Sequence, residues 1–92
     1  MALDDWGWFI ALAEQESFTK ASEYLQVSQQ TLSARLGALE KSLEVKLITR
    51  GTPLSLTPAG SVFLLYAREQ KQAQQDMLRQ IGEVTGNGVG TL

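Results

Sequence analysis

Four leucines recur at steps of three and four residues in the middle of this 92-residue chain. At about 100° per residue they fall within one narrow arc, which predicts a helix with a single apolar face. These residues are Leu32, Leu36, Leu39 and Leu43. The opposite face of the same helix carries Gln30, Ala34, Gly37 and Lys41.

Two shorter segments before this helix also have helical spacing. The first stripe consists of Leu3, Trp6, Phe9, Ile10 and Ala13. Trp8 lies off that stripe, which predicts a partly exposed side chain or a subunit contact. Ser17 is the expected N-cap of a second helix, and Ser28 is the expected N-cap of the leucine helix. The inward residues of the second helix are expected to be Phe18, Ala21, Ser22 and Leu25.

After Val45 the apolar period changes. Residues 46–49 predict a short strand, residues 51–53 a turn, and residues 54–56 a returning strand. Thr57 and Pro58 then form a favoured helix start, with Thr at the N-cap and Pro at the first helical position. The last helix is expected to run from Pro58 to about Ile81, and four glycines at 82, 86, 88 and 90 mark its end and a flexible tail.

The composition excludes several classes of function. Ninety-two residues form one small domain, and the chain has neither Cys nor His. This removes zinc fingers and Ser-His or Cys-His catalysis, so we expect no catalytic residue, metal or cofactor. Asp4 and Asp5 stand where a signal peptide would be positive, and no apolar run is long enough to span a membrane. We therefore expect a cytoplasmic protein with no membrane partner.

The charge is unevenly distributed along the chain. The total is −2, and residues 1–16 alone contribute −4. Residues 17–50 carry five bases and three acids, whereas residues 51–92 are neutral. A basic excess confined to one central stretch gives weak support to a local nucleic-acid contact.

Three short helices followed by a small hairpin is the element order of a winged helix-turn-helix, and the residues make the likeness specific. The run from Ser17 to Ser33 resembles the LysR-type helix-turn-helix of bacterial transcription regulators. In that family a Ser-Phe pair opens the second helix, small residues pack the helix crossing, and Ser-Gln opens the recognition helix. The resemblance covers about residues 3–67, and the last helix is similar to the family's linker helix. Further matches are Leu39-Glu40, Leu43, Leu47, Arg50, Leu56-Thr57 and Ala59-Gly60.

The resemblance implies a mainly α fold, with a winged helix-turn-helix at 1–57, a linker helix at 58–82 and a tail at 83–92. It implies a non-enzymatic transcription regulator that binds double-stranded DNA sequence-specifically, as a homodimer on an interrupted inverted repeat. A small-molecule effector would act only through a domain that would follow the tail and is not in this chain. A truncated piece and a natural short form are both compatible with that expectation.

The candidate DNA contacts lie around the recognition helix. The expected base-contacting residues are Gln29, Gln30, Ser33 and Ala34. The expected backbone-contacting residues are Lys20, Ser28, Thr31, Arg35 and Arg50. For Ser33 both a base and a phosphate remain open, and Ser28 can cap the helix and hold a phosphate together. The family commonly has Arg at the position of Ala34, and the wing here is shorter and lacks a basic residue at its tip.

The last helix is predicted to be the dimerisation element, because its distal half is too long and too rich in glutamine to be buried on its own domain. The alternative is a helix that packs only on its own domain. The expected seam, near heptad spacing, consists of Phe63, Ala67, Gln70, Gln74, Met77, Leu78 and Ile81.

Two other functions compete with DNA binding. A winged helix used for protein–protein contact is compatible with the low net charge and with Ala34. A small hydrolase that works through carboxylates is opposed by the absence of His, of a phosphate-binding glycine loop and of a convincing acid pair. Glu40 is expected to make a structural hydrogen bond.

Overall fold

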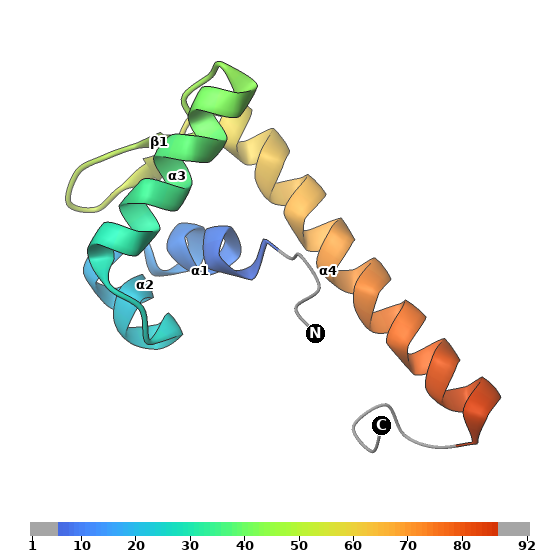
Figure 1. Cartoon of the computed structure of the whole chain (residues 1–92). Coiled ribbons are helices and arrows are strands. Elements are labelled where there is room, and N and C mark those ends of the chain that lie inside the picture. Colours follow the sequence, from blue (N-terminus) through green and yellow to red (C-terminus); the bar gives the residue numbers. More distant parts are fainter. Residues whose placement is uncertain (1–5, 87–92) are drawn as a thin grey trace.

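The computed structural model describes residues 6–86 and contains four helices and one hairpin in that range. The helices are α1 (Gly7–Gln15), α2 (Phe18–Leu25), α3 (Gln29–Leu43) and α4 (Pro58–Thr85). The strands β1 (Ile48–Thr49) and β2 (Ser55–Leu56) pair antiparallel, with Ile48 opposite Leu56. Figure 1 shows α1 to α3 and the hairpin gathered at one end, with α4 extending away from them. The predicted mainly α winged helix-turn-helix with a long final helix is confirmed.

Side-chain caps set the three helix starts that the sequence predicted. The Ser17 hydroxyl accepts a hydrogen bond from the Lys20 N–H at 3.1 Å, and the Ser28 hydroxyl accepts one from the Thr31 N–H at 3.0 Å. Thr57 caps α4 in the same way, directly before Pro58. Each cap satisfies a backbone donor that has no partner within the helix.

The core surrounds α1. Residues 8–12 are all buried, although they point to every side of the helix. This is the burial pattern of a helix covered all round, and α2 and α4 both pack on α1. The largest fully buried side chains are Phe9, Leu12, Leu32, Leu36, Leu47 and Leu54.

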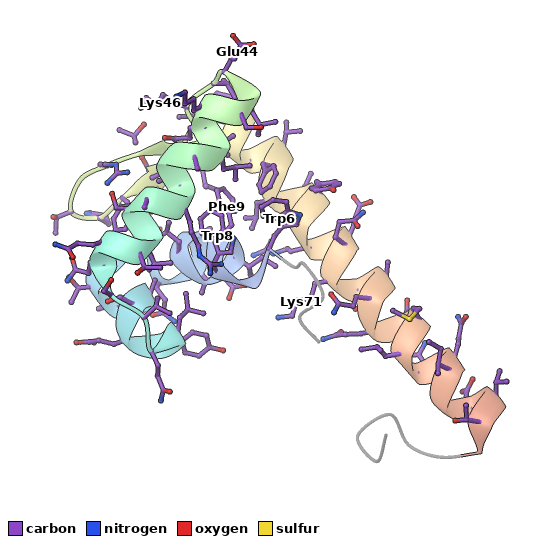
Figure 2. All side chains as sticks on the ribbon, in the orientation of Figure 1. Trp6, Trp8, Phe9, Glu44, Lys46 and Lys71 are labelled. Carbon is purple, nitrogen blue, oxygen red and sulfur yellow. The ribbon has the colours of Figure 1, made fainter. Side chains whose placement is uncertain are left out.

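An aromatic cluster joins α4 to α1. The Phe63 ring lies edge-on to Trp6 and Phe9, with centroid separations of 5.1 and 4.9 Å. Trp8 is only 9% exposed and its ring lies 5.8 Å from that of Phe9 (Figure 2). The prediction of a partly exposed Trp8 is therefore wrong, because α1 is buried on more sides than its stripe indicated. The proximal part of α4 is held to the domain by these ring contacts.

Other boundaries also differ from the prediction. Leu43 is 46% exposed, because α3 ends there, beyond the part of the core that buries Leu32 and Leu36. Helix α4 continues past the glycine at 82 and ends at Thr85, with Gly86 in the left-handed conformation as its C-cap. The predicted linker boundary at 82 is thus three residues too early. Leu3 and the end of the predicted tail, residues 87–92, lie outside the described residues.

Candidate nucleic-acid interface

A tight turn between α2 and α3 positions the candidate recognition helix. Gln26 adopts a left-handed conformation, with φ of 58°, and the Val27 N–H donates to the Ser22 carbonyl at 3.0 Å. Ala21 and Ser22 are buried on α2, where small side chains allow two helices to pack closely. The turn and this packing leave the first two turns of α3 exposed along much of their circumference.

The exposed part of α3 brings together most of the predicted base-contacting residues. Gln29, Gln30 and Ala34 are exposed, whereas Ser33 is half-buried at the side nearer the hairpin. An exposed amide offers both a donor and an acceptor, which is the combination that an adenine edge requires in the major groove. Ala34 points away from the leucine stripe, as the sequence predicted.

The hydroxyls at the start of α3 interact with each other. The Ser28 and Thr31 hydroxyls lie 2.9 Å apart, and Ser28 also caps the Thr31 N–H. The capping role of Ser28 is confirmed. Both hydroxyls are exposed, so they remain accessible to a phosphate.

The cationic side chains divide into paired and unpaired groups. All eight lie in the described part of the chain, where Lys46, Arg68 and Arg79 form ion pairs with Glu40, Glu14 and Asp76. Within residues 6–86 no ion pair involves the other five, which are Lys20, Arg35, Lys41, Arg50 and Lys71. The three predicted phosphate contacts, Lys20, Arg35 and Arg50, are therefore exposed charges whose attraction for an anion is not offset by a paired carboxylate.

Glu40 fixes the hairpin to α3. Its carboxylate is buried, and one oxygen accepts hydrogen bonds from the backbone N–H groups of Leu47 at 2.8 Å and Ile48 at 3.2 Å. Lys46 lies 3.7 Å from the other oxygen and is largely exposed. The predicted structural role of Glu40 is confirmed, and it determines where the wing begins relative to the recognition helix.

Arg50 makes two contacts that the sequence analysis missed. Its guanidinium donates to the Ser33 hydroxyl at 2.8 Å and lies over the Phe18 ring, 4.8 Å from the centroid. Ser33 and Arg50 are 17 residues apart, and no local spacing signal connects them. The spacing of Phe18 predicts only a core position, but its ring also supports this charged side chain.

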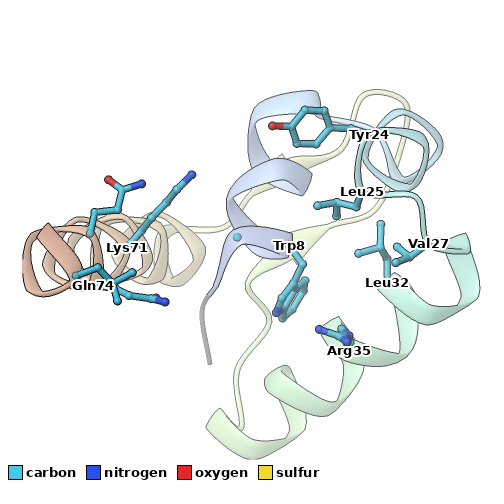
Figure 3. A pocket seen from close by; sticks show the side chains of 11 residues that line it. Trp8, Tyr24, Leu25, Val27, Leu32, Arg35, Lys71 and Gln74 are labelled. Carbon is cyan, nitrogen blue, oxygen red and sulfur yellow. The ribbon is translucent and has the colours of Figure 1, made fainter. Parts of the chain in front are cut away.

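The predicted dimer seam is divided by the structure into three groups. Ala67 is fully buried in the single chain, so its assignment to a dimer surface is wrong, whereas Phe63 packs in the aromatic cluster and is half-buried. Gln74 and Leu78 line a cleft between α4 and the winged domain. Figure 3 shows Trp8 and Arg35 across this cleft from Lys71 and Gln74. The exposed members are Gln70, Met77 and Ile81.

Two further features bear on the class of site. Within residues 6–86, no group of three or more acidic side chains is arranged to hold a metal ion. No helix in that range has the length and apolar character needed to cross a membrane.

Comparison with known families identifies the domain. Residues 3–61 match the family of bacterial regulatory helix-turn-helix proteins of the LysR type. The chain belongs to the LysR family. This is a family of regulatory proteins rather than of enzymes, and residues 3–61 are its helix-turn-helix domain.

Relatives of the LysR domain include several regulators. An uncharacterized HTH-type transcriptional regulator from Azotobacter vinelandii is 38% identical over 85 residues, covering 91% of this chain and 59% of that protein. The HTH-type transcriptional regulator BenM from Acinetobacter baylyi is 41% identical over 61 residues, covering 65% of this chain and 20% of BenM. The chain thus spans between a fifth and three fifths of the length of these two curated relatives.

Solved structures of LysR-family proteins have the same fold. The BenM DNA-binding domain, solved with catB site 1 DNA, superimposes with a TM-score of 0.81 at 33% identity and covers 85% of this chain and 88% of that one. DarR from Vibrio fischeri, also solved with DNA, gives a TM-score of 0.80 at 29% identity and covers 96% of this chain and 31% of DarR.

Proposed function

We propose that this LysR-family domain binds double-stranded DNA sequence-specifically, with α3 in the major groove. The observation that carries the proposal is the exposed start of α3 with Gln29 and Gln30, together with the exposed cations Lys20, Arg35 and Arg50, which belong to no ion pair in residues 6–86. Amides of this kind read base edges, and unpaired cations suit the phosphates of the DNA backbone. The similarity to BenM, whose DNA-binding domain was solved with DNA, supports the same conclusion.

The proposed DNA-binding unit is a homodimer formed through α4. Large apolar side chains remain exposed along one side of this helix in the single chain, and such surfaces mark interaction sites. This exposed stripe consists of Val62, Leu65, Tyr66, Met77, Ile81 and Val84. It replaces the seam predicted from the sequence, from which it retains Met77 and Ile81.

An antiparallel pairing of two α4 helices fits the stripe. A two-fold axis near Ala73 would place Val62 opposite Val84 of a second copy, because these residues are equally spaced around position 73 and lie within about 40° of each other around the helix. The two winged domains would then lie at opposite ends of a helix pair. A 28-residue helix is about 42 Å long, comparable to the roughly 34 Å between half-sites one DNA turn apart. We therefore propose an inverted repeat as the binding site.

Selection of bound sequences from a random duplex pool, followed by affinity measurement at several salt concentrations, tests the proposed function. We expect a two-fold symmetric site and an affinity that falls with salt, with one unit of slope for roughly each phosphate neutralised. A selected site without symmetry would contradict the dimer. If no duplex is retained even at low salt, the domain does not bind DNA, and its surface would be that of a protein-binding winged helix.

A further inference from the structure

Three elements meet at the guanidinium of Arg50. Arg50 follows β1 at the base of the wing, Ser33 lies on α3, and Phe18 is the first residue of α2. One Arg50 nitrogen donates to the Ser33 Oγ at 2.8 Å, and the guanidinium carbon lies 4.8 Å from the Phe18 ring centroid. The hydrogen bond and the cation–π contact together restrict where this long side chain can point.

The direction of the Arg50–Ser33 hydrogen bond determines what the Ser33 hydroxyl can still do. Arginine has only donors, so Ser33 Oγ acts as the acceptor and its own hydrogen remains available. Helical serines often direct this hydrogen to a carbonyl of the preceding turn, as Ser22 does to Thr19 at 2.8 Å. Ser33 makes no such bond in the described part of the chain, so its hydroxyl is free to donate to an acceptor outside it.

The charge beside this hydroxyl is also available. Arg50 belongs to none of the three ion pairs in residues 6–86, and its contact with Ser33 uses one of its five N–H donors. A hydroxyl donor next to unpaired guanidinium donors suits an acceptor that is itself negatively charged. A phosphate oxygen meets this requirement, since charge-assisted hydrogen bonds to phosphate are stronger than neutral ones.

We propose that Arg50 and Ser33 form a single phosphate-binding unit at the junction of the wing and the recognition helix, with Phe18 as a positioning residue for Arg50. This inference rests on the proposed DNA-binding function. It assigns Ser33 to the DNA backbone rather than to a base edge. Ser33 is half-buried on the side of α3 nearer the wing, whereas Gln30 and Ala34 occupy the exposed centre of the helix face.

A scan of neutral phosphates tests whether the two residues bind the same group. The probe is the duplex selected by the wild-type protein, with one phosphate at a time replaced by an uncharged methylphosphonate. At one position we expect the replacement to weaken wild-type binding roughly tenfold or more, but to leave Arg50→Ala and Ser33→Ala almost unaffected. The double variant should bind little more weakly than Arg50→Ala, because residues acting as a unit are not additive.

Three further variants separate this role from a merely structural one. Arg50→Lys keeps the charge but loses the planar fork of the guanidinium. Its salt slope should therefore match that of the wild type. Adding Ser33→Ala to Arg50→Lys should reduce the DNA affinity only a little further. Phe18→Leu should reduce the response at the same phosphate, with thermal unfolding confirming that the domain remains folded. Lys41→Ala is the control, because it removes an unpaired charge that lies on α3 but outside the proposed unit. This variant should respond to the same phosphate replacement as strongly as the wild type.

The outcomes distinguish the inference from the proposed function. If the wild-type protein selects a duplex but Arg50→Ala and Ser33→Ala respond at different phosphates, the shared unit is wrong and DNA binding stands. The same holds if Ser33→Ala changes the preferred base at one position and responds to no phosphate. If the wild-type protein selects no duplex, the proposed function and the phosphate unit both fail.

Discussion

The Glu40 carboxylate accepts a hydrogen bond from the backbone N–H of Leu47 at 2.8 Å, and the same oxygen also serves the next N–H along the chain. Both donors are buried, so Glu40→Ala would leave them without a partner. We expect the free energy of unfolding to fall by about 2–4 kcal/mol, given the usual penalty for buried unpaired donors. Urea denaturation measures this loss.

Glu40→Gln is the matched control for that substitution. Its amide oxygen can take the place of the carboxylate oxygen that serves both N–H groups, although it loses the charge. We therefore expect a loss of about 1 kcal/mol, clearly smaller than for the alanine variant. An equal loss in the two variants would contradict the view that the acceptor, rather than the charge near Lys46, holds the wing in place.

Two glycines provide opposite tests of close packing. A Cβ at Gly60 would overlap the carbonyl oxygen of Leu47, whereas a Cβ at Gly37 would have no atom within 4 Å. Gly60→Ala should therefore destabilise the domain by more than about 1 kcal/mol through steric overlap, and Gly37→Ala should stabilise it by up to about 1 kcal/mol through helix propensity. Thermal unfolding of both variants shows whether each substitution stabilises or destabilises the domain. A stabilised Gly60→Ala would contradict the tight contact between α4 and the Leu47 carbonyl.

The helices with one buried face could be predicted from the sequence, whereas the burial of α1 on several sides could not. Leu32 and Leu36 are buried as their stripe predicts. In α1, however, five consecutive residues are buried, because neighbouring elements cover the helix on several sides. Periodicity distinguishes a buried face from an exposed one, so it gives no warning when both faces are covered. This explains the incorrect prediction for Trp8.

In α4 the sequence is ambiguous for a related reason. Residues 62–67 are all apolar, and only the docking of Phe63 and Ala67 on the domain shows that Val62 and Leu65 form the outer side. The Arg50–Ser33 contact could not be predicted from the sequence either, because it depends on how the hairpin is placed relative to α3. The exposed positions of Gln30 and Ala34 followed from the leucine stripe alone.

Gln29→Ala should weaken binding to the selected duplex much more than binding to random DNA. Loss of a bidentate amide–base contact is worth about 1–3 kcal/mol, and random sequence offers no such contact to lose. Competition binding with the two DNAs measures the ratio. Gln75→Ala, which removes the same side chain from the cleft side of α4, is the control and should leave the ratio unchanged. Equal weakening on both DNAs would make Gln29 a positioning residue only.

Ala34→Arg should raise the affinity for DNA. Ala34 is exposed at the centre of the α3 face, where a longer cationic side chain would reach the groove, although the preferred bases can change. The added charge should steepen the salt dependence by roughly one unit if it meets a phosphate. Ser42→Arg adds the same charge near the end of α3 and is expected to give a smaller gain. An equal gain from both variants would indicate non-specific attraction.

Val62→Glu should separate the proposed dimer into monomers. Val62 is 69% exposed in the single chain, so the substitution should leave the winged domain folded. In the antiparallel pair each Val62 meets Val84 of the other copy, and two such contacts are lost at about 1.5–3 kcal/mol each, which raises the dissociation constant roughly a hundredfold or more. Sedimentation measures this change, and Gln75→Glu on the cleft side of α4 is the matched charge control.

A second charge tests the register of the pair. Adding Val84→Lys to Val62→Glu places opposite charges at each Val62–Val84 contact and should recover part of the association. Recovery in the double variant would favour the antiparallel register over a parallel one, in which position 62 would face its own copy. A Val62→Glu chain that stays dimeric would place the subunit contact on the cleft side of α4.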